Sequence, residues 1–336
     1  MHQHAVQQGV SVRPFIRTDL PRVLELLNAA LGGGPAGRRP PEFFEWKHLQ
    51  NPFGPSLLLV AEQDNQLIGL RAFMRWRFVT GGRSINAVRA VDTATHPNHQ
   101  GKGAFSRLTR TALETLGDEV DLVFNTPNGK SGPGYLKMGW REVGRVPVAI
   151  RVRHPLRLLA GGCARIRPEP PARAELAARV LERTASVAGL LEREPVPAGL
   201  ATARGLDYMR WRYGAAPLLG YRAVTEERDG RLVGLAVFRV RRRGRHWEST
   251  VTELLAGDDG STARRLLRGV VRAAPVDHLT MHVPARSPLA RAALTSGFLP
   301  APAGVRLVVN PLGGGIGPDP ADLGSWSLSL GDIEVF

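Results

Sequence analysis

The chain has 336 residues, which suggests two domains, and its apolar fraction of 43% is enough for two hydrophobic cores. Cys163 is the only cysteine, which excludes an internal disulfide and a cysteine-based metal site, and we expect no metal. No apolar run approaches the roughly 18 residues of a membrane span. The N-terminus also lacks the apolar core of a signal peptide, so we expect a cytoplasmic protein that has no membrane contact.

The net charge of +15 is carried almost entirely by arginine, because the chain has only four lysines. An arginine-rich chain that is also rich in alanine, glycine and proline is typical of a GC-rich genome, which accounts for most of this charge. No zinc finger, RNA-binding signature or heptad repeat is present, so we expect no nucleic-acid partner. A smaller part of the charge suits a polyanionic cofactor.

The chain begins with alternating strand and helix patterns. Asp19 can cap a helix that has Pro21 in its first turn. Asp64-Asn65 is typical of a hairpin turn between two apolar runs. The predicted strands of this region cover residues 10–15, 57–62, 66–73 and 75–80.

The stretch from Val88 to Arg107 is the most informative part of the sequence. It predicts a buried strand, a turn at Pro97, a glycine loop and then a helix from Ala104. Glycines at Gly101 and Gly103 let backbone N–H groups approach an anion, and the helix N-terminus adds partial positive charge. The pattern therefore predicts a cradle for a diphosphate.

Two familiar phosphate loops do not fit this cradle. A P-loop needs Ser or Thr after its lysine, but Lys102 is followed by Gly103. A dinucleotide-binding loop needs a third glycine where this chain has Ser106. The cradle must belong to another class of protein.

The sequence after the cradle continues the alternation of strands and helices. A strand is predicted over 122–125, a Pro/Gly-rich loop over 126–134, and a further strand over 143–151. Prolines and glycines then mark a linker over 153–200, with a helix inside it over 172–191. This alternation predicts an α/β protein.

Two motifs resemble those of one known family. Gln100 to Gly103, preceded by His96-Pro97, resembles motif A of the GNAT superfamily of acyl-CoA-dependent N-acyltransferases. The run Tyr-Leu-Lys-Met-Gly-Trp from Tyr135 resembles the Tyr-x-x-x-Gly-Phe signature of its motif B. Phe105 departs from the family pattern, which has Gly or Ala at that position.

The second half of the chain echoes the first. The same spacing separates Trp46 from Gly69 and Trp211 from Gly234. Further matches are Asp92 with Glu253, Pro127 with Pro284, and Gly139-Trp140 with Gly297-Phe298. The second copy has no glycine cradle, because residues 261–266 read Ser-Thr-Ala-Arg-Arg-Leu. We therefore predict a duplication whose second copy is not catalytic.

These observations predict a fold and a domain division. The expected fold is α/β, with two tandem GNAT-like mixed-sheet domains and flanking helices. The predicted parts are a catalytic GNAT domain over 10–152, a linker with a helix over 153–200, a degenerate GNAT-like domain over 201–312, and a C-terminal tail over 313–336. We expect the apolar residues of the tail to pack back on the body.

The resemblance implies acetyl-CoA as cosubstrate and assigns its contacts. The central strand would bind the pantetheine arm and the thioester carbonyl, and the loop amides would hold the pyrophosphate. Asn125, at the end of its strand, would either bond the pantetheine arm or cap the strand. The expected cofactor-binding residues are Thr93, Ala94, Thr95, Gln100, Gly101, Lys102, Gly103, Ala104, Phe105 and Asn125.

Two residues are candidates for the chemistry itself. Tyr135 matches the general-acid tyrosine of the family, which protonates the leaving thiolate, although a core aromatic residue would give the same pattern. Asp92 places a charge inside the central strand, where a charged side chain is rare unless it has a partner or a function. It could act as a base or bind a cationic acceptor, or it could form a buried ion pair with an arginine.

The leading hypothesis is an N-acetyltransferase that moves an acetyl group from acetyl-CoA to a primary amine, by direct attack and with Tyr135 as general acid. One alternative is a tandem-GNAT aminoacyltransferase that uses aminoacyl-tRNA, and another is a non-catalytic CoA-binding protein. The acceptor amine is not predicted by the sequence, because function depends on the site and not on the fold.

Overall fold

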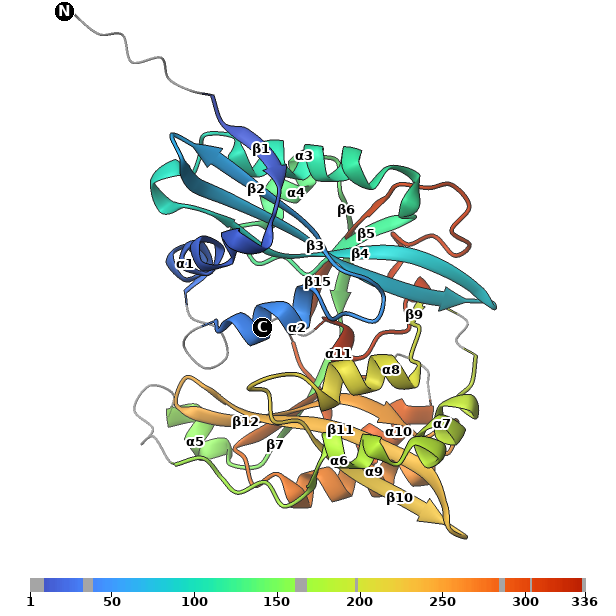
Figure 1. Ribbon diagram of the computed structural model, residues 1–336. Coiled ribbons are helices and arrows are strands. Elements are labelled where there is room, and N and C mark those ends of the chain that lie inside the picture. Colours follow the sequence, from blue (N-terminus) through green and yellow to red (C-terminus); the bar gives the residue numbers. More distant parts are fainter. Residues whose placement is uncertain are drawn as a thin grey trace, which may run out of the picture.

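The computed structural model describes residues 9–32, 39–160, 168–196, 199–283, 288–302 and 304–333. They form two mixed β-sheets that lie one above the other, with helices on both outer faces and between the sheets (Figure 1). This arrangement confirms the predicted α/β class. Within the described ranges, no helix combines the length and the hydropathy needed to cross a bilayer.

The first sheet has eight strands in the order β1-β2-β3-β4-β5-β15-β6, and β9 pairs with β3 beside this path. The predicted hairpin between β2 and β3 is confirmed, since Asp64 and Asn65 have φ of 50° and 60° at its turn. The strands of this sheet are β1 (Ser11–Pro14), β2 (Leu57–Gln63), β3 (Gln66–Thr80), β4 (Arg83–Thr95), β5 (Leu122–Asn125), β6 (Arg141–Val146), β9 (Ala201–Thr202) and β15 (Val305–Pro311).

The second sheet has seven strands in the order β14-β7-β13-β12-β11-β10-β8. Its central strands repeat the pattern of the first sheet, because β10, β11 and β12 are antiparallel neighbours and β13 is parallel to β12. The strands are β7 (Val148–Val152), β8 (Glu175–Leu176), β10 (Arg222–Arg228), β11 (Arg231–Arg243), β12 (His246–Leu255), β13 (His278–His282) and β14 (Leu299–Pro300).

The two sheets separate three apolar cores, which the helices cover. One core lies under α3 and α4 on the outer face of the first sheet, one lies under α9 and α10 on the outer face of the second, and the largest fills the space between the sheets. The helices are α1 (Leu20–Leu31), α2 (Pro41–His48), α3 (Ala104–Leu116), α4 (Gly132–Lys137), α5 (Pro155–Ala160), α6 (Ala177–Glu182), α7 (Thr184–Glu192), α8 (Leu206–Met209), α9 (Gly260–Ala273), α10 (Pro288–Thr295) and α11 (Leu330–Ile333).

Equivalent glycines let one helix approach each sheet closely. A Cβ atom at Gly69 of β3 would lie 2.8 Å from a methyl carbon of Leu108 on α3. A Cβ atom at Gly234 of β11 would lie 2.9 Å from the equivalent carbon of Leu266 on α9. Any larger residue at either position would push its helix away from the sheet. The close helix–sheet contact is thus the same in both halves.

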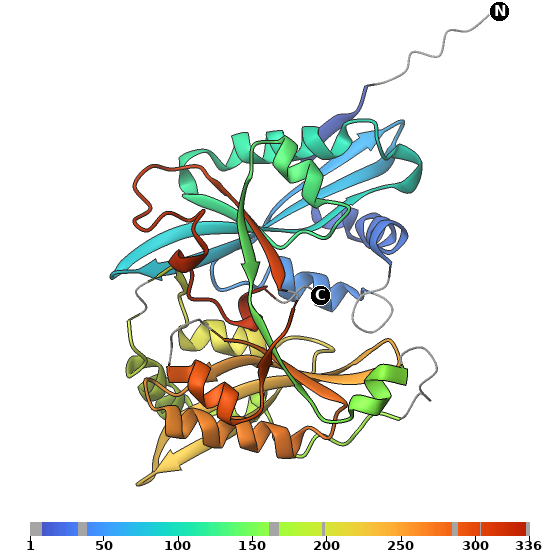
Figure 2. The same cartoon turned by 180° about the vertical axis from the view of Figure 1, so that it is seen from behind.

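Each sheet contains strands from the other half of the chain, and besides the short β9 on β3 these are β15 in the first sheet and β7 in the second. β15 lies between β5 and β6 in the first sheet, and β7 lies between β13 and β14 in the second. Figure 2 shows the green chain passing directly from the upper sheet to the lower one at this exchange. No single cut in the chain therefore separates the two sheets.

The exchange corrects one prediction. The strand expected over 143–151 is wrong, because β6 ends at Val146 and β7 begins at Val148 in a different sheet. Pro147 lies between them and lacks the amide hydrogen that a continuous ladder would use. The predicted domain limits 10–152 and 201–312 therefore do not coincide with the two sheets.

The segment predicted as a linker contributes one short strand to the second sheet and a helix that packs on it. β8 pairs with β10, and α7 packs on β11. The single helix expected over 172–191 is instead two helices, α6 and α7, which meet at Arg183. The tail packs back as expected: Trp326, Leu328, Leu330 and Ile333 are all buried, whereas Val335 lies outside the described residues.

Candidate active site

A glycine loop joins β4 to α3, where the sequence places it. Gly101 and Gly103 have φ of 76° and 82°, the left-handed region that other residues avoid. A Cβ atom added to either would meet nothing within 4 Å, so the space beside the loop is open. Gly103 is also the N-cap of α3 and offers its first amides no side-chain acceptor. The start of this 13-residue helix can therefore receive an anion.

β4 extends beyond its pairing with β5. The two strands pair only between Ala87–Arg89 and Leu122–Phe124. The expected contact residues 93–95 lie further along β4, where this pairing has ended, and Asn125 ends β5. The backbone groups on that edge of β4 can therefore form hydrogen bonds with an extended ligand that leads away from the glycine loop.

The polar residues around the loop hold its backbone. Gln100 Nε2 donates to the carbonyl of Thr95 at 3.3 Å, which ties the loop to the end of β4. His96 Nδ1 accepts from the amide of Asn98 at 3.3 Å, as expected of a turn residue. Lys102 is exposed, so its charge is free to meet a ligand at the loop. Asn125 Oδ1 accepts from the amide of Thr126 at 2.7 Å, as the strand-capping alternative predicts.

Tyr135 lies on α4, against the outer face of the first sheet. Its side chain is 2% exposed, and its hydroxyl oxygen accepts a hydrogen bond from Arg71 Nη1 at 2.8 Å. The same nitrogen donates to Thr93 Oγ1 at 2.7 Å. The ring of Phe105 packs edge-on against Tyr135, with 5.5 Å between ring centroids. Three residues singled out from the sequence, Thr93, Phe105 and Tyr135, thus meet around one guanidinium group.

Arg71 is a site residue that the sequence analysis missed. It is 0% exposed, and its Nε and Nη2 atoms find no hydrogen-bond partner among the described residues. The guanidinium lies over the ring of Phe73, 4.3 Å from its centroid. Burying a cation without a carboxylate costs several kcal/mol, so such a group needs a functional reason. The sequence does contain a signal for Arg71, because a charged residue within an apolar strand is unusual. The same signal drew attention to Asp92.

Asp92 lies at a bulge of β4, on the face that meets α2. Its φ of 41° is rare for a residue other than glycine. Its Oδ1 lies 2.7 Å from Arg39 Nη1, and its Oδ2 lies 2.7 Å from Lys47 Nζ and 3.0 Å from His48 Nε2. Because α2 lies between the sheets and α4 lies on the outer face, Asp92 and Tyr135 are on opposite sides of the first sheet (Figure 1).

The charges around Asp92 keep it ionised. Burial alone would raise the pKa of Asp92, but the charge of Lys47, the hydrogen bond from His48 and the charge of Arg39 hold that pKa well below its usual range. Burial lowers the pKa of Lys47 and of His48. His48 is therefore neutral and donates to the carboxylate through Nε2. This geometry favours the ion-pair alternative for Asp92.

Comparison with known proteins matches one family model to the first half of the chain. The model of the acetyltransferase (GNAT) domain matches residues 11–143. No curated protein sequence matches the chain.

Three similar solved structures share the fold of nearly the whole chain. A probable N-acyltransferase from Enterococcus faecalis V583 has a TM-score of 0.65 at 13% identity, over 90% of this chain and 72% of that one. A GCN5-related N-acetyltransferase from Anabaena variabilis has a TM-score of 0.64 at 11% identity, over 91% and 73%. Eis1 from Mycobacterium abscessus has a TM-score of 0.56 at 18% identity, over 90% and 74%. The part of the chain that carries the glycine loop, residues 11–143, belongs to the GNAT family of acetyltransferases.

Proposed function

We propose that the protein is an N-acetyltransferase that transfers an acetyl group from acetyl-CoA to a primary amine. The observation that carries this proposal is the open glycine loop before α3, which offers backbone amides and a positive helix end to a diphosphate. The equivalent position before α9 is closed, because the Asp259 side chain accepts from the amide of Ser261 at 2.9 Å. The first half alone therefore suits a CoA ligand.

The residues of the first half fit acetyl-CoA along one path. The amides from Gly101 to Phe105, with the charge of Lys102, would hold the diphosphate. The edge of β4 over 93–95 would bind the pantetheine arm, with Asn125 across from it. When bound, acetyl-CoA supplies the activated acyl group as a thioester. The chain must then hold the acyl carbonyl, admit a neutral amine and protonate the leaving sulfur.

We assign the proton transfer at the leaving sulfur to Tyr135. Arg71 donates to the Tyr135 oxygen, and no described residue accepts the hydroxyl hydrogen, so the O–H remains free to donate. The buried positive charge also stabilises the phenolate that remains after the transfer. Arg71 is thus a positioning residue for Tyr135, and Thr93 holds the guanidinium in place.

We assign Asp92 a positioning role as well, in place of the base that the sequence left open. A carboxylate with three close partners and a strongly lowered pKa is a poor proton acceptor. Its partners Lys47 and His48 belong to α2, so Asp92 fixes this helix on the bulge of β4. We therefore expect its loss to affect folding more than proton transfer.

Titration of the full chain with acetyl-CoA by calorimetry tests the proposal. We expect micromolar binding to the wild-type protein and none to Gly103→Trp, because the new side chain fills the open loop. The matched control is Gly244→Trp, since Gly244 also has a positive φ, 63°, and open space around it, but lies in a hairpin of the second sheet. The control should bind acetyl-CoA as the wild type does.

The other outcomes separate the two alternatives. Absence of binding at millimolar acetyl-CoA would contradict the proposal and favour the tRNA-dependent aminoacyltransferase, which does not need the glycine loop. Binding without release of CoA in the presence of a panel of amines would favour the non-catalytic CoA-binding protein.

A further inference from the structure

The second half contains a cavity of about 530 Å³, within the range typical of small-molecule sites. β12 and β13 pair between Glu248–Val251 and His278–Met281 and then separate. The cavity is lined by the residues that follow on both strands, 252–255 and His282. In the first half, the equivalent part of β4 is the proposed place of the pantetheine arm. The cavity therefore occupies the position of a substrate slot in the second half.

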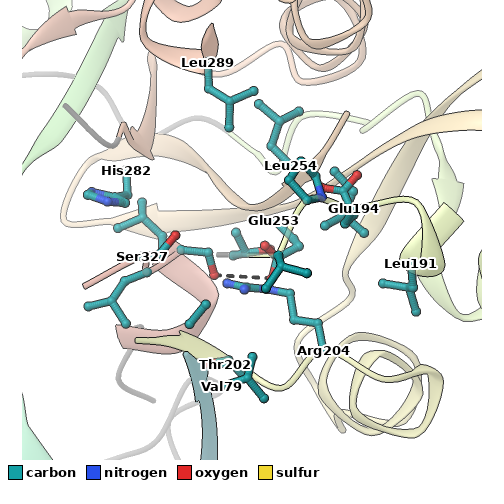
Figure 3. A pocket seen from close by; sticks show the side chains of 18 of the residues that line it. Val79, Leu191, Glu194, Thr202, Arg204, Glu253, Leu254, His282, Leu289 and Ser327 are labelled. Carbon is teal, nitrogen blue, oxygen red and sulfur yellow. Dashed lines mark hydrogen bonds and ion pairs between the residues drawn. The ribbon is translucent and has the colours of Figure 1, made fainter. Parts of the chain in front are cut away.

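The walls of this cavity combine leucines with acidic groups. His282 lies on one side and Leu191 on the other, with Glu253 and Arg204 between them (Figure 3). The apolar part of the lining includes Leu191, Leu254, Leu289 and Leu328. A ligand here meets an apolar surface that has a few polar atoms, as in most sites for small organic molecules.

Glu253 presents an unused oxygen to this cavity. The residue is 4% exposed. Its Oε2 accepts from Arg204 Nε at 3.0 Å, from the Tyr213 hydroxyl at 3.1 Å and from Ser329 Oγ at 3.3 Å. Its Oε1 accepts from no residue that the structure describes. This oxygen is not enclosed by the protein, so it is open to accept a hydrogen bond from a ligand in the cavity.

Two more acceptors line the same cavity. Glu194 Oε1 accepts from the amide of Gly257 at 2.9 Å, while its Oε2 has no donor in the described part of the chain. His282 Nδ1 lies 2.7 Å from the carbonyl of Pro147, which only accepts, so the ring hydrogen is on Nδ1. Burial lowers the pKa of His282, so the ring is neutral and its Nε2 is an acceptor. The cavity therefore offers these three acceptors to a donor.

The charged side chains around the cavity indicate the charge of the group that would donate. Arg204 is shared between Glu253 and Asp332, with its Nη2 2.8 Å from Asp332 Oδ2. Arg212 donates to the carbonyl of Gly331 and to the Tyr221 hydroxyl. Among the residues that line the cavity, the acidic Glu192, Glu194 and Glu253 outnumber the single guanidinium group of Arg204. A surplus of negative charge in a chain of net charge +15 favours a cation.

We propose that this cavity binds a small organic ammonium ion, with its nitrogen near Glu253 and Glu194 and its apolar body against the leucines. A phosphate-bearing ligand does not fit, because the Asp259 carboxylate caps α9 where the first half has its glycine loop. The site is separate from the proposed acyl-CoA path and does not depend on it.

Calorimetry on the full chain with three probes of equal length tests the sign of the charge. Hexylammonium should bind, whereas hexanoate should not, and 1-hexanol should bind at least about tenfold more weakly than the amine. Burial, followed by the charge of Glu253, raises the pKa of Glu194. Hexylammonium should therefore bind more tightly as the pH rises and Glu194 loses its proton. Equal binding of hexanoate would overturn the proposal.

Variants of the second half locate the binding. Glu194→Gln should weaken hexylammonium binding about tenfold or more, and Leu289→Trp, which fills the cavity, should abolish it. Glu182→Gln is the matched control, because it removes the same charge from an exposed position on α6 and should change nothing. If hexylammonium binds the wild type and both cavity variants equally, the amine binds elsewhere and the proposal is wrong. Melting curves identify any variant that has lost its fold.

Discussion

The two halves of the molecule hold a buried carboxylate in equivalent surroundings. The carboxylate lies at a bulge in each half, Asp92 in β4 and Glu253 in β12. Each one contacts an arginine that precedes a short helix, and also a side chain of the helical segment that follows this arginine. Trp46 and Trp211 are 165 positions apart, and the flanking polar residues keep the same spacing. The corresponding pairs are Asp92 and Glu253, Arg39 and Arg204, Lys47 and Arg212, and His48 and Tyr213.

The two tryptophans show how symmetric this arrangement is. Trp46 Nε1 donates to the carbonyl of Trp211 at 2.8 Å, and Trp211 Nε1 donates to the carbonyl of Trp46 at the same distance. Their rings stack with 5.2 Å between centroids. A network that both halves keep around such a reciprocal contact is best explained as part of the architecture. It argues that Asp92 acts in folding, since only one half has the glycine loop.

The difference between the carboxylates lies in their balance of charge. Asp92 faces two cations, Arg39 and Lys47, and its pKa is lowered. Glu253 shares Arg204 with Asp332, and burial raises its pKa. The same frame therefore carries a satisfied anion in the first half and a surplus of negative charge in the second. Local side chains, and not the fold, set what each half can bind.

The largest expected effect is on catalysis, which should depend on a tyrosine of the first half and not on a comparable tyrosine of the second. Tyr135→Phe should lower kcat about 100- to 10,000-fold while leaving acetyl-CoA binding intact, because only the proton donor is lost. Tyr221→Phe is the matched control, since its hydroxyl also accepts from a buried arginine, Arg212, but lies in the second half. Steady-state kinetics with any accepted amine measures both variants. An unchanged kcat for Tyr135→Phe would remove this residue from the mechanism.

The next prediction compares the two carboxylates by stability. Asp92→Asn should lower the free energy of unfolding by about 3–5 kcal/mol at neutral pH, because it leaves two buried cations unpaired. Since the pKa of Asp92 is lowered, its stabilisation is present above the unfolded-state pKa and is lost as the pH falls through the folded-state value. Urea unfolding at acidic and neutral pH should show that Asn at this position removes part of the acid sensitivity.

Glu253→Gln should behave in the opposite sense. Because the pKa of Glu253 is raised, its contribution is present below the unfolded-state pKa and is lost as the pH rises through the folded-state value. The neutral amide should therefore cost less at neutral pH than Asp92→Asn does. If both variants show the same pH dependence in urea unfolding, the difference in charge balance between the halves is not as described.

A smaller effect is expected at Arg71. Arg71→Met should lower kcat about tenfold with little change in KM, because Tyr135 loses its oriented hydroxyl and the nearby charge. Arg71→Lys should restore part of the activity. A change in KM alone would contradict the positioning role.

The smallest expected effect concerns the closed helix end of the second half. Asp259→Ala should cost about 1 kcal/mol of stability, the usual value of an N-cap, and leave acetyl-CoA binding unchanged. Thermal unfolding and calorimetry measure the two quantities. A second equivalent of bound acetyl-CoA in this variant would show that the cap, and not the missing glycines, closes the second half.

The glycine loop could be predicted because its information is local. Gly101, Gly103 and the start of α3 lie within a few residues, and their backbone conformation follows from residue type. The hairpin at Asp64-Asn65 was predictable for the same reason. The strand exchange was not, because β6 and β7 are nearly continuous in sequence and only their pairing assigns them to different sheets. The partners of Asp92 were equally hidden, since Arg39 is 53 positions away from it.

By itself, the sequence determined the α/β class, the glycine loop before α3, and the echo between the halves, including the match of Asp92 with Glu253. The tertiary structure decided which residues meet: Arg71 with Tyr135, Asp92 with α2, and Glu253 with a cavity. Residue type and short-range spacing set backbone conformation, and so they can be read along the chain. Burial, charge balance and unpaired polar atoms depend on groups brought together from distant positions, and so only packing reveals them.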